Sequence, residues 1–245
     1  MKKILVPNDV QIAVIGDIHE HSEQFFKILD QIKPSKNTWI VSLGDVGEKG
    51  FGEKEFNSIT DKLMELSYLN IGYACRGNHE IKMIKRNKND LSCQLQWWKK
   101  QPLSITFEFA SGALLTCLHA GVLPSMSWES IQNNTEVVYI RDIDSNLRMI
   151  PLVWQVINGV KTLIPAKPDG KSWHSYYDGR FGYIASGHNA QKDGIAKYYN
   201  YSCNLDSAVF DTGILTAQMF TSEGKLGEQI TVTGTPFKPK LNVKE

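Results

Sequence analysis

The chain repeatedly closes a short apolar run with a polar turn, and five of these runs end in the same way. They read QIAVIGDIH, TWIVSLGD, IGYACRGNH, ALLTCLHAG and FGYIASGH, from residues 11, 38, 71, 113 and 181. Short runs rich in β-branched residues and closed by glycine are typical of buried strands followed by tight turns. Each of these predicted strands ends beside Asp, Asn or His.

Helical patterns separate the first three predicted strands. Apolar residues with helical spacing form one face in each of two segments: Phe25, Ile28, Leu29 and Ile32, then Phe56, Ile59, Leu63 and Leu66. Asp17 and Asp45 are 28 residues apart, and Asp45 and Asn78 are 33 apart. Both separations are close to the roughly 30 residues of a βαβ unit. Such units place strands in parallel, so Asp17, His19, Asp45 and Asn78 are predicted to meet at one sheet edge.

The second half of the chain is richer in strand patterns. SITFEF, ALLTCLH, GYIASGH, IAKYYNY, CNLDSAVF, GILTAQMF and EQITVTG predict strands with short turns. A βαβαβ start followed by a β-rich half favours an α/β fold with two sheets packed face to face and helices outside. We expect one domain over 1–235, with an irregular, cap-like insert around 133–180 and a flexible tail at 236–245.

Composition narrows the classes of function. The chain has 245 residues and a net charge of +1, which gives no electrostatic basis for binding a nucleic-acid duplex or a membrane surface. No apolar run reaches the length of a signal-peptide core or a membrane span. The cysteines form no C-x-x-C pair, so we expect free thiols in a cytoplasmic protein. The oligomeric state is left open.

The polar residues at the strand ends form a set of potential metal ligands. They are Asp17, His19, Asp45, Asn78, His119 and His188. Each motif alone is typical of a turn or a helix cap, but the ordered set supplies nitrogen and oxygen ligands without sulfur. Imidazole favours Mn, Fe, Co, Ni or Zn over Mg and Ca. Six ligands exceed one four-coordinate site and suit two ions about 3.5–4 Å apart, with Asp45 as the bridge.

The ordered motifs GDIH, LGD, RGNHE, HAG and GH resemble those of the calcineurin-like metallophosphoesterases. The resemblance is to the phosphoprotein-phosphatase branch and its diadenosine tetraphosphatase relatives. It spans most of residues 11–220 and includes the C-terminal segment CNLDSAVFDTGILTAQMF. It implies a four-layer α/β/β/α sandwich of two mixed sheets and two divalent transition-metal ions, with manganese foremost. It also implies that Asp17 and His19 bind the first ion, that Asp45 bridges, and that Asn78, His119 and His188 bind the second.

The resemblance also implies a mechanism in which hydroxide attacks phosphorus. His79 would protonate the leaving oxygen, and Arg76 would hold a phosphate oxygen. The family pattern Gly-Asp-x-x-Asp-Arg-Gly is replaced by GDVGEKG, so Glu48 and Lys49 stand where the family has Asp and Arg. They either take those roles or form only a turn. Glu20, where the family has glycine, is expected at the rim of the site, restricting bulky substrates.

Further candidates lie in the irregular segment. By the same resemblance, Arg141 and Arg180 are candidate phosphate contacts. Four aromatic residues there either stack on a base or pack beneath a loop: Trp154, Trp173, Tyr176 and Tyr177.

The leading hypothesis is a phosphohydrolase acting on a small phosphorylated compound, a nucleotide or a dinucleoside polyphosphate. A small protein Ser/Thr phosphatase is the alternative enzyme, and a non-catalytic scaffold of the same fold is the alternative of another class.

Overall fold

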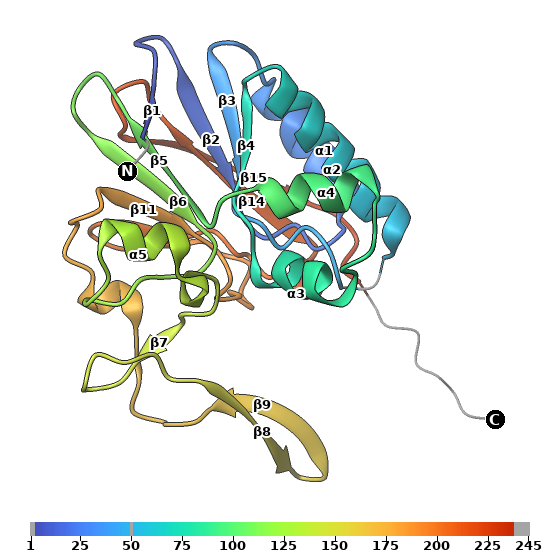
Figure 1. The fold of residues 1–245 in the computed structure, drawn as a ribbon, viewed down its shortest axis with the longest axis vertical. Coiled ribbons are helices and arrows are strands. Elements are labelled where there is room, and N and C mark those ends of the chain that lie inside the picture. The colour runs from blue at the N-terminus through green and yellow to red at the C-terminus, as the bar shows by residue number, and fades with distance from the viewer. Residues whose placement is uncertain (1–2, 50, 238–245) are drawn as a thin grey trace.

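The computed structural model describes residues 3–49 and 51–237, and two sheets form its centre (Figure 1). The five-stranded sheet has the order β15-β14-β2-β3-β4, with the bounds Leu226–Thr233, Ile214–Phe220, Gln11–Ile15, Thr38–Ser42 and Gly72–Ala74. The six-stranded sheet has the order β1-β5-β6-β11-β13-β12, with the bounds Ile4–Leu5, Ser104–Glu108, Leu114–Leu118, Tyr183–Ser186, Ser202–Asn204 and Lys197–Tyr198. Both sheets mix parallel and antiparallel pairs, as predicted.

Helices cover the outer faces of both sheets (Figure 1). The α-helices α1 to α6 span Ser22–Ile32, Glu53–Tyr68, Asn78–Arg86, Cys93–Lys100, Trp128–Asn133 and Val209–Thr212. Two 3-10 helices span Thr135–Val138 and Trp173–Tyr176. Helices α1 and α2 contact the five-stranded sheet, and α5 contacts β5 of the other sheet.

Three apolar clusters fill the spaces between these layers. The first joins α1 and α2 to the five-stranded sheet through residues such as Phe25 and Leu63. The second lies between the sheets and contains Val14 and Phe107. The third lies outside the six-stranded sheet and contains Trp173. The predicted four-layer α/β/β/α sandwich is therefore confirmed.

The strands that precede the candidate ligands all run as the sequence predicts. Strands β2, β3 and β4 are adjacent and parallel, while β6 and β11 are parallel neighbours in the other sheet. Strand β14 pairs antiparallel with β2, so a C-terminal strand completes the N-terminal sheet. These pairings bring the carboxyl ends of five strands from both sheets to one end of the sandwich.

One predicted strand is shorter than expected. The run CNLDSAVF was predicted as a strand, but β13 ends at Asn204 and a short helix begins at Val209. The Asp206 side chain accepts the N–H of Ala208, which is left-handed with φ 54°. Such an Asx turn reverses the chain, which ends the strand.

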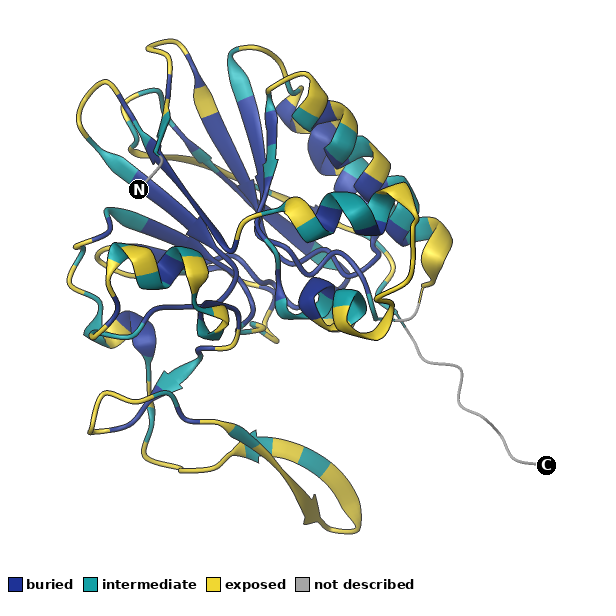
Figure 2. Ribbon diagram, viewed as in Figure 1, coloured by how far each residue is buried: buried dark blue, intermediate teal, exposed yellow. Residues whose placement is uncertain are grey.

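Residues 133–180 include a projecting hairpin. Strands β8 and β9 span Leu152–Ile157 and Val160–Pro165, and Figure 2 shows this ribbon as mostly exposed, away from the sandwich. The short strands β7 and β10, at Asp142–Ile143 and Lys171–Ser172, pair at its base.

The aromatic residues of this segment have different environments. Trp154 is 62% exposed on the hairpin, while Trp173 is buried against Tyr177. Tyr176 and Tyr177 pack against the same cluster. Packing beneath a loop is thus the environment of Trp173 and both tyrosines.

Three further expectations concern the whole chain. All four cysteines are free, and three of them are buried. Among the described residues, no helix has the length and apolarity needed to cross a membrane. The tail expected at 236–245 lies outside the described residues from 238 onward.

We predict that the same substitution at two tryptophans has very different effects on stability. Trp98 is fully buried and its indole N–H donates to Thr60 Oγ1 at 3.1 Å, so Trp98→Ala should lower the free energy of unfolding by about 3–5 kcal/mol. The exposed Trp154 should tolerate alanine with a change below about 0.5 kcal/mol. Urea unfolding measures both, and equal losses would contradict the position of the hairpin outside the core.

Candidate metal centre

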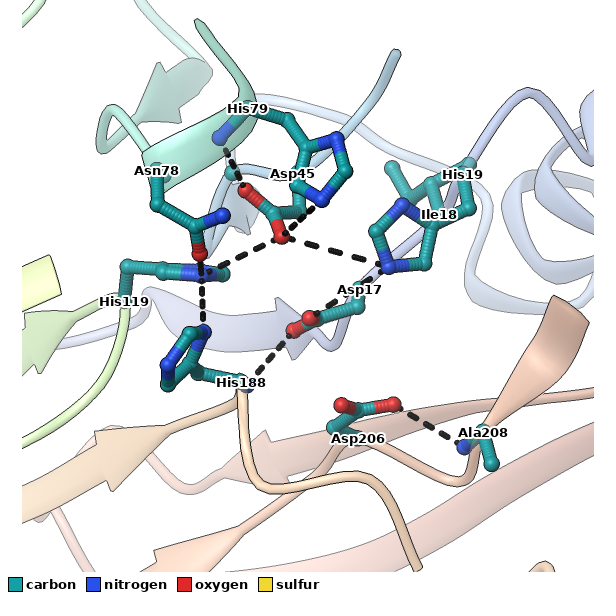
Figure 3. A network of polar contacts seen from close by, with 12 residues as sticks. Asp17, Ile18, His19, Asp45, Asn78, His79, His119, His188, Asp206 and Ala208 are labelled. Atoms are coloured by element: carbon teal, nitrogen blue, oxygen red, sulfur yellow. Dashed lines mark hydrogen bonds and ion pairs between the residues drawn. The ribbon is translucent and has the colours of Figure 1, made fainter. Parts of the chain in front are cut away.

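The six predicted ligands lie together at the end of the sandwich (Figure 3). Five are buried and Asn78 is half-buried. They surround a narrow cleft of about 80 Å³, whose lining includes Asp17, His19, Asp45, Asn78 and His188, and His119 lies behind Asn78 and His188. The first four come from loops of the five-stranded sheet, and the two last histidines follow β6 and β11.

One oxygen of Asp45 lies at the centre of this cluster. Asp45 Oδ2 is 3.3 Å from His119 Nε2, 3.7 Å from His79 Nε2 and 3.9 Å from His19 Nε2. The other oxygen, Oδ1, accepts the backbone N–H of His79 at 2.9 Å. This bond fixes the carboxylate so that Oδ2 faces the imidazoles.

The hydrogen bonds of His119 show that the cluster fits a metal ion. His119 Nδ1 lies 3.0 Å from the carbonyl oxygen of Leu43, which can only accept, so Nδ1 carries the proton. Nε2 lies 3.0 Å from Asn78 Oδ1 and 3.1 Å from His188 Nδ1, and it would offer its lone pair to a cation that replaces the proton there. Lone pairs from several side chains face one space, and a divalent transition metal satisfies such a set.

Two three-residue groups have ligand atoms close enough to share an ion: His19, Asp45 and His79, and Asp45, His119 and His188. Asp45 belongs to both, in keeping with its predicted bridging position. Asp17 approaches the first group, with Oδ2 at 3.8 Å from His19 Nε2. The grouping also includes His79, which the sequence assigned to acid catalysis instead.

The electrostatics of the cluster favour added positive charge. Burial opposes a charge on His119, but Asp45 and Asp17 outweigh it and raise the pKa of His119 to about 10. Burial and the neighbouring carboxylate of Asp206 raise the pKa of Asp17 well above its usual range. Buried carboxylates require cations, which protons or metal ions can supply.

Glu80 holds two of the ligand-bearing loops together, a role that sequence reasoning missed. It is buried, with Oε2 accepting the N–H groups of Asp45 and Gly77 and Oε1 accepting that of Val46, all at 2.8 Å. Burial and the charge of Asp45 raise the pKa of Glu80 to about 7. Its place at N3 of α3, as in a capping box, was the available sequence signal.

The glycines of the GNH and GH motifs leave room for carboxylates. A Cβ at Gly77 would collide with Asp45 Oδ1, and one at Gly187 would collide with Asp17 Oδ1. Only glycine permits this close approach of backbone and carboxylate.

The backbone around the centre is strained at several ligands. His19, Asp45 and His188 are left-handed, with φ of 44°, 49° and 66°. Non-glycine residues in this region cost on the order of 1–3 kcal/mol each, and such residues cluster at functional sites. The surrounding hydrogen bonds keep these side chains directed into the cleft.

His79 lies at the cleft, and the carboxylate of Glu48 is slightly too far away to form a hydrogen bond with it. Its Nδ1 is 3.8 Å from Glu48 Oε2, longer than a hydrogen bond. Glu48 instead pairs with Lys82 at 3.2 Å and Arg86 at 2.8 Å, which links α3 to this loop. Burial lowers the pKa of His79.

Two of the predicted phosphate contacts line the cleft. Lys49 lies on its wall, with Nζ 5.2 Å from the ring centroid of Phe210. Arg141 enters from the 133–180 segment, and its Nε–H donates to His188 Nε2 at 2.9 Å.

The other two predicted phosphate contacts do not line this cleft. Arg180 donates to Asp178 Oδ1 at 2.9 Å and to the Pro124 carbonyl oxygen at 2.6 Å, so its guanidinium is held elsewhere. Arg76 lines a separate cavity beside Ser104.

The expectation for Glu20 in the first loop is wrong. Glu20 is not at the rim: it is 6% exposed and accepts the backbone N–H groups of Glu48 and Gly52. It therefore supports the following loop rather than restricting substrates. The neighbouring His21 is also buried, at 2% exposed, and packs on Phe51.

Asp206 is a further acid in the cleft that sequence reasoning did not select. It is 2% exposed, lines the cleft, and accepts the N–H of Ala208 at 2.9 Å (Figure 3). Burial raises its pKa. The Asn-Leu-Asp sequence after β13 was the only available signal, since it resembles the other strand ends.

Comparison with solved structures establishes the fold independently. A candidate diadenosine tetraphosphatase is 22% identical, with a TM-score of 0.67 over 95% of this chain and 97% of that chain. A protein serine/threonine phosphatase from Saccharomyces cerevisiae with similarity to human phosphatase PP5 is 15% identical, with a TM-score of 0.60 over 97% and 85%. A cold-active protein-tyrosine phosphatase from a psychrophilic Shewanella species is 13% identical, with a TM-score of 0.50 over 95% and 83%.

Comparison of sequences identifies the family. No curated protein matches the chain. Residues 10–192, well over half of the chain, match the profile of the calcineurin-like phosphoesterases. These residues contain all six strand-end ligands and His79. The chain therefore belongs to the calcineurin-like phosphoesterases, a family of metal-dependent hydrolases that act on phosphorylated substrates.

Proposed function

We propose that this phosphoesterase is a dinuclear enzyme that hydrolyses a nucleotide or a dinucleoside polyphosphate. The observation that carries the proposal is the single carboxylate oxygen of Asp45, which faces three imidazoles at 3.3–3.9 Å. A carboxylate placed between two sets of nitrogen ligands suits a bridge between two cations.

The ligand sets follow from this arrangement. Asp17 and His19 would hold one ion, and Asn78, His119 and His188 the other, with Asp45 shared. The three imidazoles favour a transition metal over Mg²⁺ or Ca²⁺, and we infer Mn²⁺ as the first candidate, with Fe, Zn, Co and Ni as alternatives. When bound, such ions activate a water molecule as the nucleophile and neutralise charge on the phosphoryl oxygens.

The remaining side chains of the cleft would assist the reaction. His79, at its edge, would give a proton to the leaving oxygen, as a general acid. Glu48 would orient that imidazole after a shift that closes the 3.8 Å gap. Lys49 and Arg141 would bind phosphoryl oxygens, Lys49 as a point charge and Arg141 through its planar guanidinium.

The substrate class rests on the shape of the site and on structural likeness. The cleft is narrow, about 80 Å³, which suits a phosphoryl group attached to a flexible small molecule. The similar structure described as a candidate diadenosine tetraphosphatase supports a nucleotide. The similarity to a serine/threonine phosphatase supports a phosphoprotein as the second candidate.

Two further assignments complete the proposal. Residues 133–180 would act as a cap-like insert of the single domain, because they deliver Arg141 to the cleft. The four free cysteines suit a reducing compartment, and we infer a cytoplasmic location.

We predict that hydrolysis requires Mn²⁺, Co²⁺ or Ni²⁺ and is lost on chelation, because imidazole-rich sites select these ions. Phosphate release should be measured with p-nitrophenyl phosphate, phosphopeptides and nucleotides, and the nucleotide products of dinucleoside polyphosphates should be separated by chromatography, because cleavage between two phosphates yields two nucleotides and no free phosphate. Preference for the last two classes supports the proposed substrate, whereas preference for phosphopeptides supports the alternative. Full activity after exhaustive chelation, or purified protein without any metal by mass spectrometry, would rule out the dinuclear centre.

We predict that Asp45→Asn abolishes activity and lowers the bound metal from two ions to one or none, because a neutral amide cannot hold two dications near each other. Asp211→Asn is the matched control, since Asp211 lines the same cleft but is exposed. Metal stoichiometry and turnover are measured for both variants. An Asp45→Asn protein with two ions and normal turnover would show that Asp45 is not the bridge.

We predict that Asn78→Ala and His79→Ala fail in different ways. Loss of a ligand weakens metal binding, so excess Mn²⁺ should partly restore the hydrolysis rate of Asn78→Ala. Loss of a general acid reduces the rate about 10²–10⁴-fold with alkoxide leaving groups, and added metal should not restore it. With p-nitrophenyl phosphate, whose leaving group needs no proton, His79→Ala should be affected much less.

The comparison therefore uses both substrates across a metal titration. Equal losses of His79→Ala on the two substrates, or its rescue by metal, would identify His79 as a ligand, which its position near His19 and Asp45 also permits.

A further inference from the structure

A second polar cavity lies beside the start of β5, apart from the metal cleft. Its volume is about 650 Å³, and its lining includes Tyr73, Arg76, Lys99, Lys100 and Ser104. It shares no lining residue with the cleft around Asp45. Among the described residues that line it, three are cations and none is acidic. The cavity therefore has an excess of positive charge.

Arg76 is a half-buried cation of this cavity, and its side chain has no partner within the described residues. Its Nε is buried and makes no hydrogen bond, and no carboxylate lies within ion-pair distance. Burial lowers the pKa of Arg76. Burying the Nε–H of a guanidinium without a hydrogen bond is costly, because that donor loses its solvation. Some acceptor from outside the described chain would remove that cost.

Ser104 is a second buried donor without a partner. It is 6% exposed, and its Oγ makes no hydrogen bond to the described residues. Ser104 is the first residue of β5 and pairs with Leu118 of β6, the residue before His119. The cavity therefore lies beside the end of the strand that precedes one of the candidate metal ligands. Two orphaned donors, a guanidinium N–H and a hydroxyl, thus line the same cavity.

The positions of Lys99 and Lys100 have a simpler explanation, which does not account for the two donors without hydrogen-bond partners. Lys99 and Lys100 occupy the last turn of α4, where cations interact favourably with the helix dipole. Lys99 Nζ contacts only the backbone oxygens of Lys88 and Asp90, at 3.4 and 3.5 Å. The dipole accounts for the lysines, but it satisfies neither Arg76 Nε nor Ser104 Oγ.

We propose that this cavity binds a phosphate-type anion, with the half-buried Arg76 and the buried Ser104 as inner contacts and Lys99 and Lys100 at the rim. Guanidinium and hydroxyl donors with no competing carboxylate are the groups that recognise phosphate oxygens. The volume lies within the range of small-molecule sites and exceeds what one phosphate fills, so a small organic phosphate is also accommodated. The site extends beyond the proposed function, because it requires no bound metal.

The test is calorimetric titration of the full chain with inorganic pyrophosphate in the presence of a chelator. We expect saturable binding of one pyrophosphate per chain. Reversing the rim charges in Lys99→Glu/Lys100→Glu should weaken it at least about tenfold, which corresponds to about 1.4 kcal/mol. Arg76→Lys keeps the charge but lacks the Nε–H, and it should also weaken binding.

The matched control is Lys27→Glu/Lys62→Glu, which makes the same charge change on exposed positions of α1 and α2. It should leave pyrophosphate affinity within about twofold, since distant surface charges are screened. Absence of binding to the unmodified chain, or equal weakening in both double variants, would overturn the proposal. Because metals are absent, this result is independent of whether the chain proves catalytically active.

Kinetics with metal restored then identifies the source of the anion. If the anion in this cavity is the distal phosphate of a substrate, Lys99→Glu/Lys100→Glu should raise the KM for ATP and leave the KM for p-nitrophenyl phosphate unchanged. If it is a free anion, the KM for ATP should stay constant, and pyrophosphate should alter turnover of p-nitrophenyl phosphate only in the unmodified chain. Both patterns support the anion site.

Discussion

The buried carboxylate of Glu80 sets the positions on which the rest of the centre depends. It accepts three backbone N–H groups from the loops after β3 and β4, which ties Asp45 to the start of α3. These bonds offset the desolvation of a charge that lies close to a second carboxylate. With the loops joined, the N–H of His79 can hold Asp45 Oδ1, and Oδ2 is left facing the imidazoles.

The same centre also depends on contact between two sheets. Asp17, Asp45 and Asn78 follow strands of the five-stranded sheet, whereas His119 and His188 follow β6 and β11 of the other. The N–H of His188 donates to Asp17 Oδ1 at 3.0 Å, and this bond connects the two halves directly. The apolar cluster between the sheets, which includes the buried Cys75, Cys117 and Cys203, fixes their separation. Core packing and ligand geometry are therefore coupled, because a shift of either sheet changes the distances at Asp45.

The arginine and lysine side chains near this end of the molecule lie where their hydrogen-bond and ion-pair partners hold them. Arg180 is held by Asp178 and a carbonyl oxygen, and Arg86 and Lys82 pair with Glu48. Arg141 reaches the cleft from an insert that lies outside both sheets. Arg76 follows a core strand, yet its guanidinium lies in a different cavity from the ligand two residues later. Motif membership alone does not specify which cavity a long side chain enters.

The sequence by itself determined the local elements and the identity of the candidate ligands. Continuous apolar runs closed by polar turns predicted β2, β3 and β4, and helical spacing of apolar residues predicted α1 and α2. The ordered strand-end residues gave the metal ligands as a set. The pairing of β14 with β2 was decided by tertiary contacts, since no local spacing encodes which strands pair.

Within the site, only the tertiary structure decided which side chains share a space. Glu80 and Glu20 are acidic residues near predicted helix starts and turns, where acids are usually solvated, yet both are buried. Their burial depends on backbone N–H groups supplied by segments up to 35 residues away. The sequence specifies residue chemistry and local direction. Long-range hydrogen bonds and sheet packing decide which of those groups meet, because their partners are distant along the chain.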